Sequence, residues 1–309
     1  MTAEPPTFEH IPVLPQETIA GLQPRPGGQY LDATVGGGGH SKLILEADPT
    51  IRLTALDQDG AAIAAAQAEL AEYCDRITFC RSNFAEFKPG NQQFNGILAD
   101  LGVSSAQFDI PERGFSFRLT APLDMRMDQR QEISAAEIVN HWEEVELARI
   151  IYIYGEERLS RRIARQIVAQ RPFNTTTELA DAISKCVPTK YRYGRIHPAT
   201  RTFQALRIAV NRELEVLERF LELAPTWLEP GGRLAIISFH SLEDRIVKHA
   251  IKGSPLLSVV TKKPIIATDD EIQQNPRARS AKLRVAERRE DDMGEGERGE
   301  WKTRRGRDR

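Results

Sequence analysis

The 309-residue sequence contains only three cysteines, and they are not arranged in pairs. Cys74, Cys80 and Cys186 lack the spacing of a disulfide framework or of a CxxC metal site. The six histidines also lack the short spacings of metal-binding motifs. We therefore expect neither a disulfide-stabilised secreted domain nor a bound metal ion.

Long apolar runs are missing as well. The longest candidates, residues 97–99 and 234–237, fall far short of the roughly 18 residues that a membrane-spanning helix needs. The N-terminus has no charged stretch followed by an apolar stretch, so it does not resemble a signal peptide. These absences predict a cytoplasmic protein with no membrane partner.

The most informative segment that is present covers residues 30–41, YLDATVGGGGHS. A short apolar strand ends at Asp32, four glycines follow at 36–39, and a helix is expected from Ser41. Glycine backbone can lie directly against a ligand, and a helix N-terminus offers free N–H groups to an anion. The segment therefore predicts a site for a nucleotide-like ligand.

Spacing separates three ligands for this turn. A P-loop is excluded because His40, not lysine, precedes Ser41. A dinucleotide fingerprint matches only weakly, since Ser41 stands where its third glycine belongs. S-adenosylmethionine fits best, because Asp57 ends the next predicted strand and can bind ribose hydroxyls. NAD-binding sites also use an acidic residue to bind the ribose. An NAD-dependent oxidoreductase and a purely structural turn therefore remain alternatives.

The net charge of −2 hides a strong asymmetry. Residues 158–212 contain ten Arg and two Lys against only Glu178 and Asp181, a local excess of +10. Such segregation indicates a polyanion-binding surface, although a solvated helix face is the alternative. Four of the arginines recur at helical spacing and are expected to share one face. The candidate RNA-binding residues are Arg158, Arg161, Arg162, Arg165, Arg192, Arg195 and Arg201.

Strand and helix patterns alternate at both ends of the chain, which is typical of a parallel sheet with helices on both faces. The predicted strands are 30–33, 51–57, 77–80, 96–101 and 233–239, with late strands at 257–266 and 282–288 as an antiparallel edge. Helices are expected at 41–47, 60–73, 200–226 and 241–252. Between the two halves, only helices are expected, at 134–141, 143–153, 156–170 and 176–186.

The domain prediction follows from this pattern. Residues 1–106 and 200–289 should form two parts of one α/β domain, and residues 107–199 an inserted helical domain for substrate recognition. Residues 290–309 are too polar to bury a core and should form a disordered charged tail.

Six motifs give the sequence a resemblance to a known family. They are DLGVSSAQFD at 100–109, RGFSF at 113–117, PLDMRMD at 122–128, HPATRTFQALRI at 197–208, ISFHSLEDR at 237–245 and NPRARSAKLR at 275–284. Together they resemble the RsmH (MraW) family over residues 8–289. The resemblance implies a Rossmann-like, S-adenosylmethionine-dependent methyltransferase sheet with an inserted all-helical domain. It also implies methylation of a cytosine N4 amino group in the decoding region of 16S rRNA, within the 30S subunit.

The resemblance assigns cofactor-binding residues. Gly38, Gly39 and His40 would lie along the methionine end, and Asp57 at the ribose. Phe84 would lie near the adenine, with Asp100 and Gln107 around the remaining polar groups. Asp100, or a nearby backbone carbonyl, is also the candidate catalytic acceptor for the hydrogens of the target amine.

Two questions stay open in the sequence. The Asp/Asn-Pro-Pro-aromatic clamp of many amino methyltransferases is absent after Asp100, so the grip on the base is unknown. Phe239 or His240 is a candidate stacking partner, but His240 equally fits a helix start. A noncatalytic ribosome-assembly factor is an alternative function, and the oligomeric state, including a homodimer, is undetermined.

Overall fold

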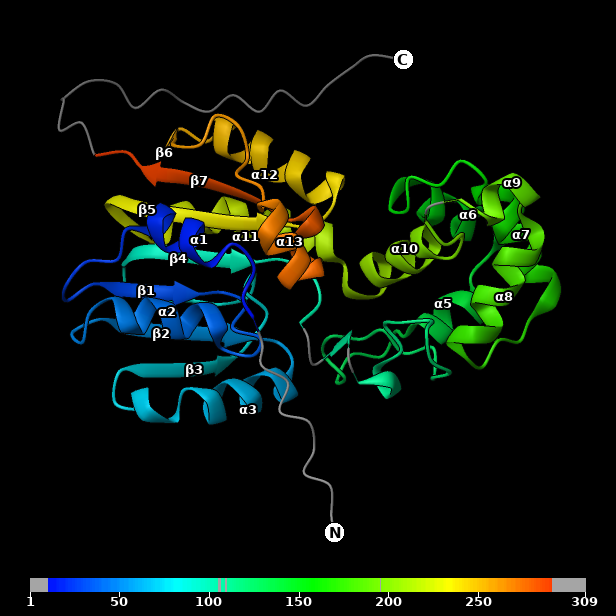
Figure 1. Cartoon of the computed structure of the whole chain (residues 1–309), viewed down its shortest axis with the longest axis horizontal. Coiled ribbons are helices and arrows are strands. Elements are labelled where there is room, and N and C mark those ends of the chain that lie inside the picture. The colour runs from blue at the N-terminus through cyan, green and yellow to red at the C-terminus, as the bar shows by residue number, and fades with distance from the viewer. Residues whose placement is uncertain (1–10, 105–106, 109, 195, 291–309) are drawn as a thin grey trace, which may run out of the picture.

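The computed structural model describes residues 11–290 except 105–106, 109 and 195. It consists of a sheet with helices on both faces and a separate group of helices beside one end of that sheet (Figure 1). In this view the parallel strands point toward the helical group, so their carboxyl ends face it (Figure 1). The Gly-rich turn follows the first strand at this end.

The sheet has seven strands in the order β3-β2-β1-β4-β5-β7-β6. The strands are β1 (Gln29–Asp32), β2 (Arg52–Asp57), β3 (Ile77–Arg81), β4 (Phe94–Asp100), β5 (Leu228–Ser238), β6 (Leu257–Val259) and β7 (Lys282–Arg288). The first five strands pair in parallel, while β7 pairs antiparallel with both β5 and β6. Neighbouring β1, β2 and β4 each end in an aspartate, at Asp32, Asp57 and Asp100.

Helices bury apolar side chains against both faces of the sheet. One face carries α1 (Pro15–Leu22), α2 (Gly39–Ala47) and α3 (Gly60–Glu69), whose buried residues share a core with Tyr30 and Leu98. The other face carries α11 (Glu213–Trp227) and α12 (Ser241–Gly253), which pack on Leu31 and Ile97. The short η1 (Ala71–Tyr73), α13 (Asp269–Gln274) and η3 (Pro276–Ser280) connect these layers to the strands.

The helical group has its own apolar core. Its elements are η2 (Pro111–Arg113), α5 (Ala135–His141), α6 (Glu144–Ile153), α7 (Ser160–Gln170), α8 (Thr176–Cys186), α9 (Thr189–Arg192) and α10 (Thr200–Asn211). Ile150, Ile163, Leu179 and Leu206 are buried in this core. The buried side chains of α10 therefore belong to the helical group, and the chain returns to the sheet at Arg212.

The predicted fold class is confirmed, with three corrections to its elements. The single helix expected at 200–226 is two helices, because Arg212 adopts a left-handed conformation with φ +51°. The helix expected at 156–170 begins only at Ser160, so Arg158 precedes it. The late strand expected at 257–266 is limited to β6, with an isolated bridge at Ile265.

Three helices, α1, α9 and α13, were not predicted, and the sheet's last parallel strand was expected only from residue 233. β5 begins at Leu228, with an irregular register opposite Phe94 and Gly96. Among the described helices, none is both long and apolar enough to cross a membrane. The tail from residue 291 onward lies outside the described residues.

Candidate active site

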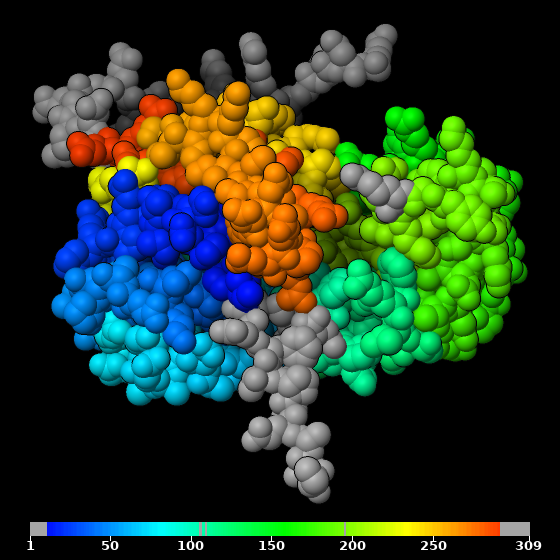
Figure 2. All heavy atoms as spheres, in the orientation of Figure 1, coloured from blue at the N-terminus to red at the C-terminus, as the bar shows by residue number. Residues whose placement is uncertain are grey.

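A cavity of about 290 Å³ opens at the carboxyl ends of the parallel strands, and its lining extends to the start of α11. Residues that follow β1, β2, β3, β4 and β5 all contribute to its lining. In the space-filling view, a hollow separates the orange segment around α13 from the green helical group (Figure 2). This is the place where an α/β sheet of this kind binds its ligands.

The glycine turn forms one wall of this cavity. Gly36 and Gly39 line it, and Gly36 has φ +50°, which favours glycine. Gly38 does not line the cavity. It begins α2 with φ +89°, and a Cβ there would lie only 3.1 Å from the side chain of Leu70. Of the two predicted glycines, Gly39 is therefore placed to meet a ligand, whereas Gly38 lets α2 pack closely on the end of α3.

Asp57 lies at the end of β2 and lines the cavity, as predicted for a ribose-binding carboxylate. It accepts hydrogen bonds from the backbone N–H groups of Gly36 (3.1 Å) and Asp59 (2.9 Å). Burial raises the pKa of Asp57 to about 6, although these two hydrogen bonds act in the opposite direction. A carboxylate has about four acceptor positions, so Asp57 retains capacity for two hydroxyl groups.

Asp32 ends β1, before the glycine turn. It is buried and is not part of the cavity lining. Its carboxylate accepts hydrogen bonds from Ser41 Oγ (2.7 Å) and Thr34 N (3.1 Å), which fix the glycine turn between β1 and α2. Burial raises the pKa of Asp32 to about 6. It is a support for the turn.

Asp100 and His40 meet in the cavity wall. Asp100 Oδ2 lies 3.6 Å from His40 Nδ1, while Oδ1 of Asp100 is buried and has no hydrogen-bond partner among the described residues. His40 Nε2 lies 2.8 Å from the carbonyl oxygen of Val13. Because a carbonyl only accepts, Nε2 carries a proton. Burial, together with the charges of Asp32 and Glu243, raises the pKa of Asp100 well above its ordinary value.

Phe84 and Gln107 both line the cavity. The Phe84 ring packs edge-on against Phe220 with a centroid separation of 4.8 Å, so it is both a core residue and a cavity residue. Gln107 is buried and donates from Nε2 to Asp59 Oδ2 (2.9 Å). Asp59 Oδ2 also accepts from Arg113 Nη1 (2.7 Å), so a buried ion pair fixes the position of Gln107.

The opposite wall comes from α10, α11 and the segment after β5. It includes Arg207, Asn211, Glu213, Phe239 and Glu243, and all of these except Phe239 were not predicted as site residues. Phe239 was expected only as a candidate for stacking. Three of the five, Arg207, Phe239 and Glu243, lie in the motifs at 197–208 and 237–245, so the motifs were the signal that could have identified them.

The sequence left His240 as either a stacking residue or a helix start, and in the structure it starts a helix. It is the N-cap residue of α12, and its side chain and that of Glu243 form a capping box. His240 is not part of the cavity lining, whereas Phe239 is. Phe239 is therefore the better placed of the two for stacking on a base.

The segment around α13 closes a third side of the cavity. Asn275 donates from Nδ2 to the carbonyl oxygen of Ile11 (3.1 Å), and Glu271 accepts from the N–H of Leu14 (2.7 Å). These bonds hold residues 11–14 against the cavity, where Ile11 and Val13 form part of its lining. The motif at 275–284 thus shapes the site through the N-terminal segment.

One group of side chains has ligand atoms close enough for a metal ion. Potential ligand atoms of Glu213, His240 and Glu243 lie within 4.8 Å of one another. However, Glu213 is paired with Arg207 through two contacts of 2.8 Å, and both ring nitrogens of His240 lie close to Glu243. The ion pair and the helix cap explain this group, and the absence of a metal stays a prediction.

Comparison with known proteins decides the family. The profile of the MraW methylase family matches residues 7–289. This chain belongs to the MraW methylase family. Its relatives include the ribosomal RNA small subunit methyltransferase H of Nostoc sp., 68% identical over 93% of this chain and 95% of that protein. The protein of that name from Synechococcus elongatus is 61% identical over 93% of this chain and 97% of its own length.

Membership of the MraW methylase family confirms the predicted class, a methyltransferase that uses S-adenosylmethionine. It excludes the alternative of an NAD-dependent oxidoreductase. Among solved structures, a putative rRNA methylase from Clostridium thermocellum is 14% identical, with a TM-score of 0.45, over 90% of this chain and 98% of that one.

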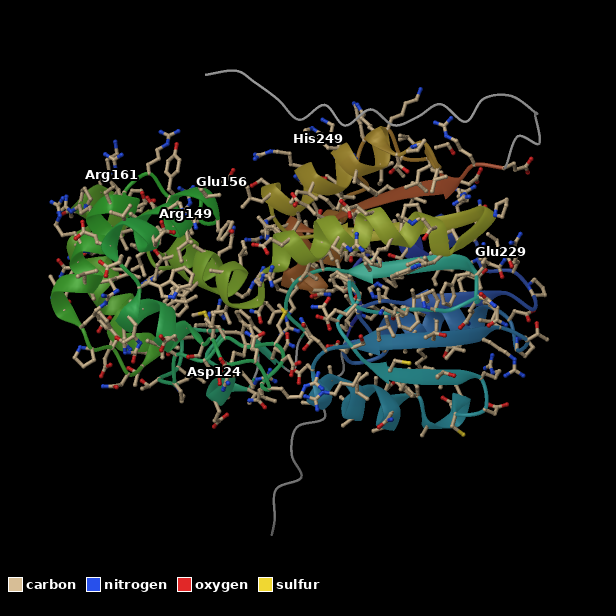
Figure 3. All side chains as sticks on the ribbon, turned by 180° about the vertical axis from the view of Figure 1, so that it is seen from behind. Asp124, Arg149, Glu156, Arg161, Glu229 and His249 are labelled. Atoms are coloured by element: carbon tan, nitrogen blue, oxygen red, sulfur yellow. The ribbon has the colours of Figure 1, made fainter. Side chains whose placement is uncertain are left out.

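The predicted RNA-binding arginines of this MraW methylase differ in exposure and in their contacts. Arg158, Arg161 and Arg162 are exposed and have no ion-pair partner among the described residues. Figure 3 shows Arg161 at the edge of the helical group that is farther from the sheet. Arg165 lies 3.7 Å from Glu144 and remains exposed.

The remaining predicted arginines are less available to bind RNA, because they contact groups of the protein itself. Arg192 donates to the carbonyl oxygen of Lys185 (3.1 Å), and Arg201 lies 3.9 Å from the buried carboxylate of Glu157. Arg195 lies outside the described residues. An RNA-binding role of these seven residues stays a prediction.

Proposed function

We propose that this chain methylates the N4 amino group of a cytosine in the decoding region of 16S rRNA, with the 30S subunit as its cytoplasmic substrate. Three observations support the proposal. The curated relatives are named as small-subunit rRNA methyltransferases, the six motifs resemble that family, and the cavity offers an acceptor for amine hydrogens. The helical group, from about η2 to α10, would recognise the RNA.

The residues around the cavity fit S-adenosylmethionine. Asp57 would accept the ribose hydroxyls, and Phe84 would contact the adenine. Gly39 and His40 would border the methionine end, where α2 begins without a side-chain cap hydrogen bond and its N-terminus suits a carboxylate. When bound, the cofactor supplies an electrophilic methyl carbon on a sulfonium sulfur.

The observation that carries the proposal is the position of the Asp100 carboxylate in the cavity wall. An exocyclic cytosine amine is a poor nucleophile because its lone pair is delocalised into the ring. A carboxylate that accepts an N–H hydrogen bond orients this lone pair and stabilises positive charge that develops on nitrogen. The Asp100 side chain lines the cavity and is 21% exposed, so its carboxylate can make this bond.

The His40–Asp100 contact can then receive the proton that the methylated nitrogen loses. Because burial raises the pKa of Asp100, the carboxylate binds a proton more strongly than an ordinary aspartate does. His40 Nδ1, 3.6 Å away, can share that proton while Nε2 stays hydrogen-bonded to Val13. No cysteine lines the cavity, so a covalent enzyme–base adduct is not part of this mechanism.

Phe239 offers a stacking surface for the flipped base. It follows β5, the neighbour of the strand that ends in Asp100. A Cβ on Gly102 would lie 3.5 Å from the Phe239 ring, so this ring lies beside the loop that lacks the usual Pro-Pro-aromatic clamp. The aromatic surface would thus come from another strand.

The test is methyl transfer from labelled S-adenosylmethionine to 30S subunits that lack the modification, followed by nucleoside analysis. We expect label in N4-methylcytidine at one position, and faster transfer to 30S subunits than to free 16S rRNA. Label in another nucleoside would refute the proposed specificity. RNA binding without transfer would favour the alternative of a noncatalytic assembly factor.

A further inference from the structure

One part of the cavity wall remains without a role in the cofactor site. It is formed by Arg207 at the end of α10, Glu213 at the start of α11, and Phe239 and Glu243 after β5. Two of these groups, Arg207 and Glu243, lie in a largely buried setting, with side chains 18% and 3% exposed. Charged groups are seldom placed in such a setting unless their contacts serve a purpose.

Arg207 is held in a fixed orientation. Its Nε and Nη2 atoms donate to the two carboxylate oxygens of Glu213, each at 2.8 Å. This two-point contact uses one edge of the planar guanidinium group. The Nη1 atom is left without a hydrogen-bond partner among the described residues, and it belongs to a side chain that lines the cavity.

Arg207, Asp100 and Glu243 all line this cavity. Burial, with a further contribution from the Glu243 charge, raises the pKa of Asp100. Phe239 follows β5 and precedes α12, the helix that carries Glu243, and it lines the same cavity. The wall therefore presents an acceptor at Asp100, an aromatic ring, and a donor at Arg207.

This arrangement matches the pairing edge of cytosine. That edge carries an amine at N4, which donates, and N3 and O2, which accept. Uracil has an acceptor in place of the amine, and adenine has no counterpart of O2. A fixed donor opposite O2 and N3, combined with an acceptor opposite N4, favours cytosine over both.

We propose that Arg207, oriented by Glu213, recognises the target cytosine by donating from Nη1 to its O2 or N3. This inference rests on the proposed function, since it assigns the base that the same cavity methylates. Arg277, another arginine of the lining, lies in η3.

The experiment compares three variants by steady-state methyl transfer to unmodified 30S subunits. Arg207→Gln removes the donor, and we expect kcat to fall about 10- to 150-fold, the effect of one hydrogen bond to a charged group. Glu213→Gln keeps an acceptor for Arg207, so its effect should be several-fold smaller. Arg219→Gln, which removes an exposed pair with Glu222 on α11, should match the wild type.

Further measurements separate base recognition from other roles. S-adenosylhomocysteine affinity of Arg207→Gln should stay near that of the wild type, and KM for 30S subunits and its salt dependence should change little. Its melting temperature should fall no further than that of Glu213→Gln, which breaks the same ion pair. A fall in kcat that is equal for Arg207→Gln and Glu213→Gln would show a purely structural contact between α10 and α11, and would overturn the proposal. A raised KM with a weaker salt dependence would show a phosphate contact, and would also overturn it.

The result also distinguishes the two proposals. If the wild type transfers no methyl group to cytosine N4, the proposed function fails. If the wild type is active and Arg207→Gln keeps kcat within about threefold of it, only the role of Arg207 fails, since a lost charged hydrogen bond has a larger effect.

Discussion

Replacing Arg113 by methionine tests whether the buried ion pair beneath the cavity is as important as its geometry indicates. Arg113 and Asp59 lie 2.7 Å apart, and their side chains are 6% and 5% exposed. Arg113 Nη2 also donates to the carbonyl oxygens of Arg126 (2.8 Å) and Met127 (3.1 Å). Arg113→Met keeps much of the side-chain volume but leaves the Asp59 charge without its cation.

The expected loss follows from what Asp59 retains. Removing one partner of a buried ion pair typically costs about 3–5 kcal/mol of unfolding free energy. Asp59 keeps hydrogen bonds from Ala61 N (3.0 Å) and Gln107 Nε2 (2.9 Å), so we expect a loss near the lower end, about 3 kcal/mol. Urea unfolding followed by circular dichroism measures this loss.

Arg130→Met is the matched control. Arg130 forms a two-point pair with Asp128, but its side chain is 60% exposed, so its removal should cost less than about 1 kcal/mol. Adding Asp59→Asn to Arg113→Met should restore part of the stability, because the uncompensated charge is then gone. If Arg113→Met lost no more stability than Arg130→Met, the reasoning about this buried pair would be wrong.

Three further predictions concern the site. Asp57→Ala should weaken S-adenosylhomocysteine binding at least tenfold by calorimetry, since a hydrogen bond to a charged group contributes about 1.5–3 kcal/mol; an unchanged affinity would remove Asp57 from the site. Burial raises the pKa of Asp100, and its ionised form is the acceptor, so kcat should fall as pH decreases through that raised pKa. Asp100→Asn should be slow and lack this inflection, and an unaltered pH profile would contradict the role. If about six cations meet RNA phosphates, a plot of the logarithm of RNA affinity against the logarithm of salt concentration should have a slope of about −4. The double variant Arg161→Ser with Arg162→Ser should reduce the size of this slope by about 1.4, and a wild-type affinity that does not depend on salt would refute an electrostatic surface.

Much of the sheet could be predicted because its strands are buried, apolar and followed by clear signals. The aspartates that end β1, β2 and β4 and the glycines at 36–39 mark the carboxyl edge of the sheet. The prediction of one long helix at 200–226 was wrong for a physical reason. Arg212 is left-handed without a glycine or proline to signal it, and the two-point contact between Arg207 and Glu213 spans the break.

Site residues were harder to predict where their partners are distant in sequence. Arg207 and Glu213 are six residues apart, but their place opposite Asp100 depends on the return of the chain from the helical group to the sheet. Asn275 shapes the cavity through its hydrogen bond to the carbonyl oxygen of Ile11, a lining residue 264 positions away in the sequence. Gly38 has the residue type and position of a ligand-binding glycine, yet packing against Leu70 accounts for it.

The central claim is that the cavity under the glycine turn binds S-adenosylmethionine and directs its methyl group toward a base at Asp100. A crystal structure with bound S-adenosylhomocysteine measures this most directly. We predict the ribose at Asp57, the adenine at Phe84 and the sulfur facing Asp100. A ligand bound elsewhere, or a turn blocked by its neighbouring side chains, would contradict the claim.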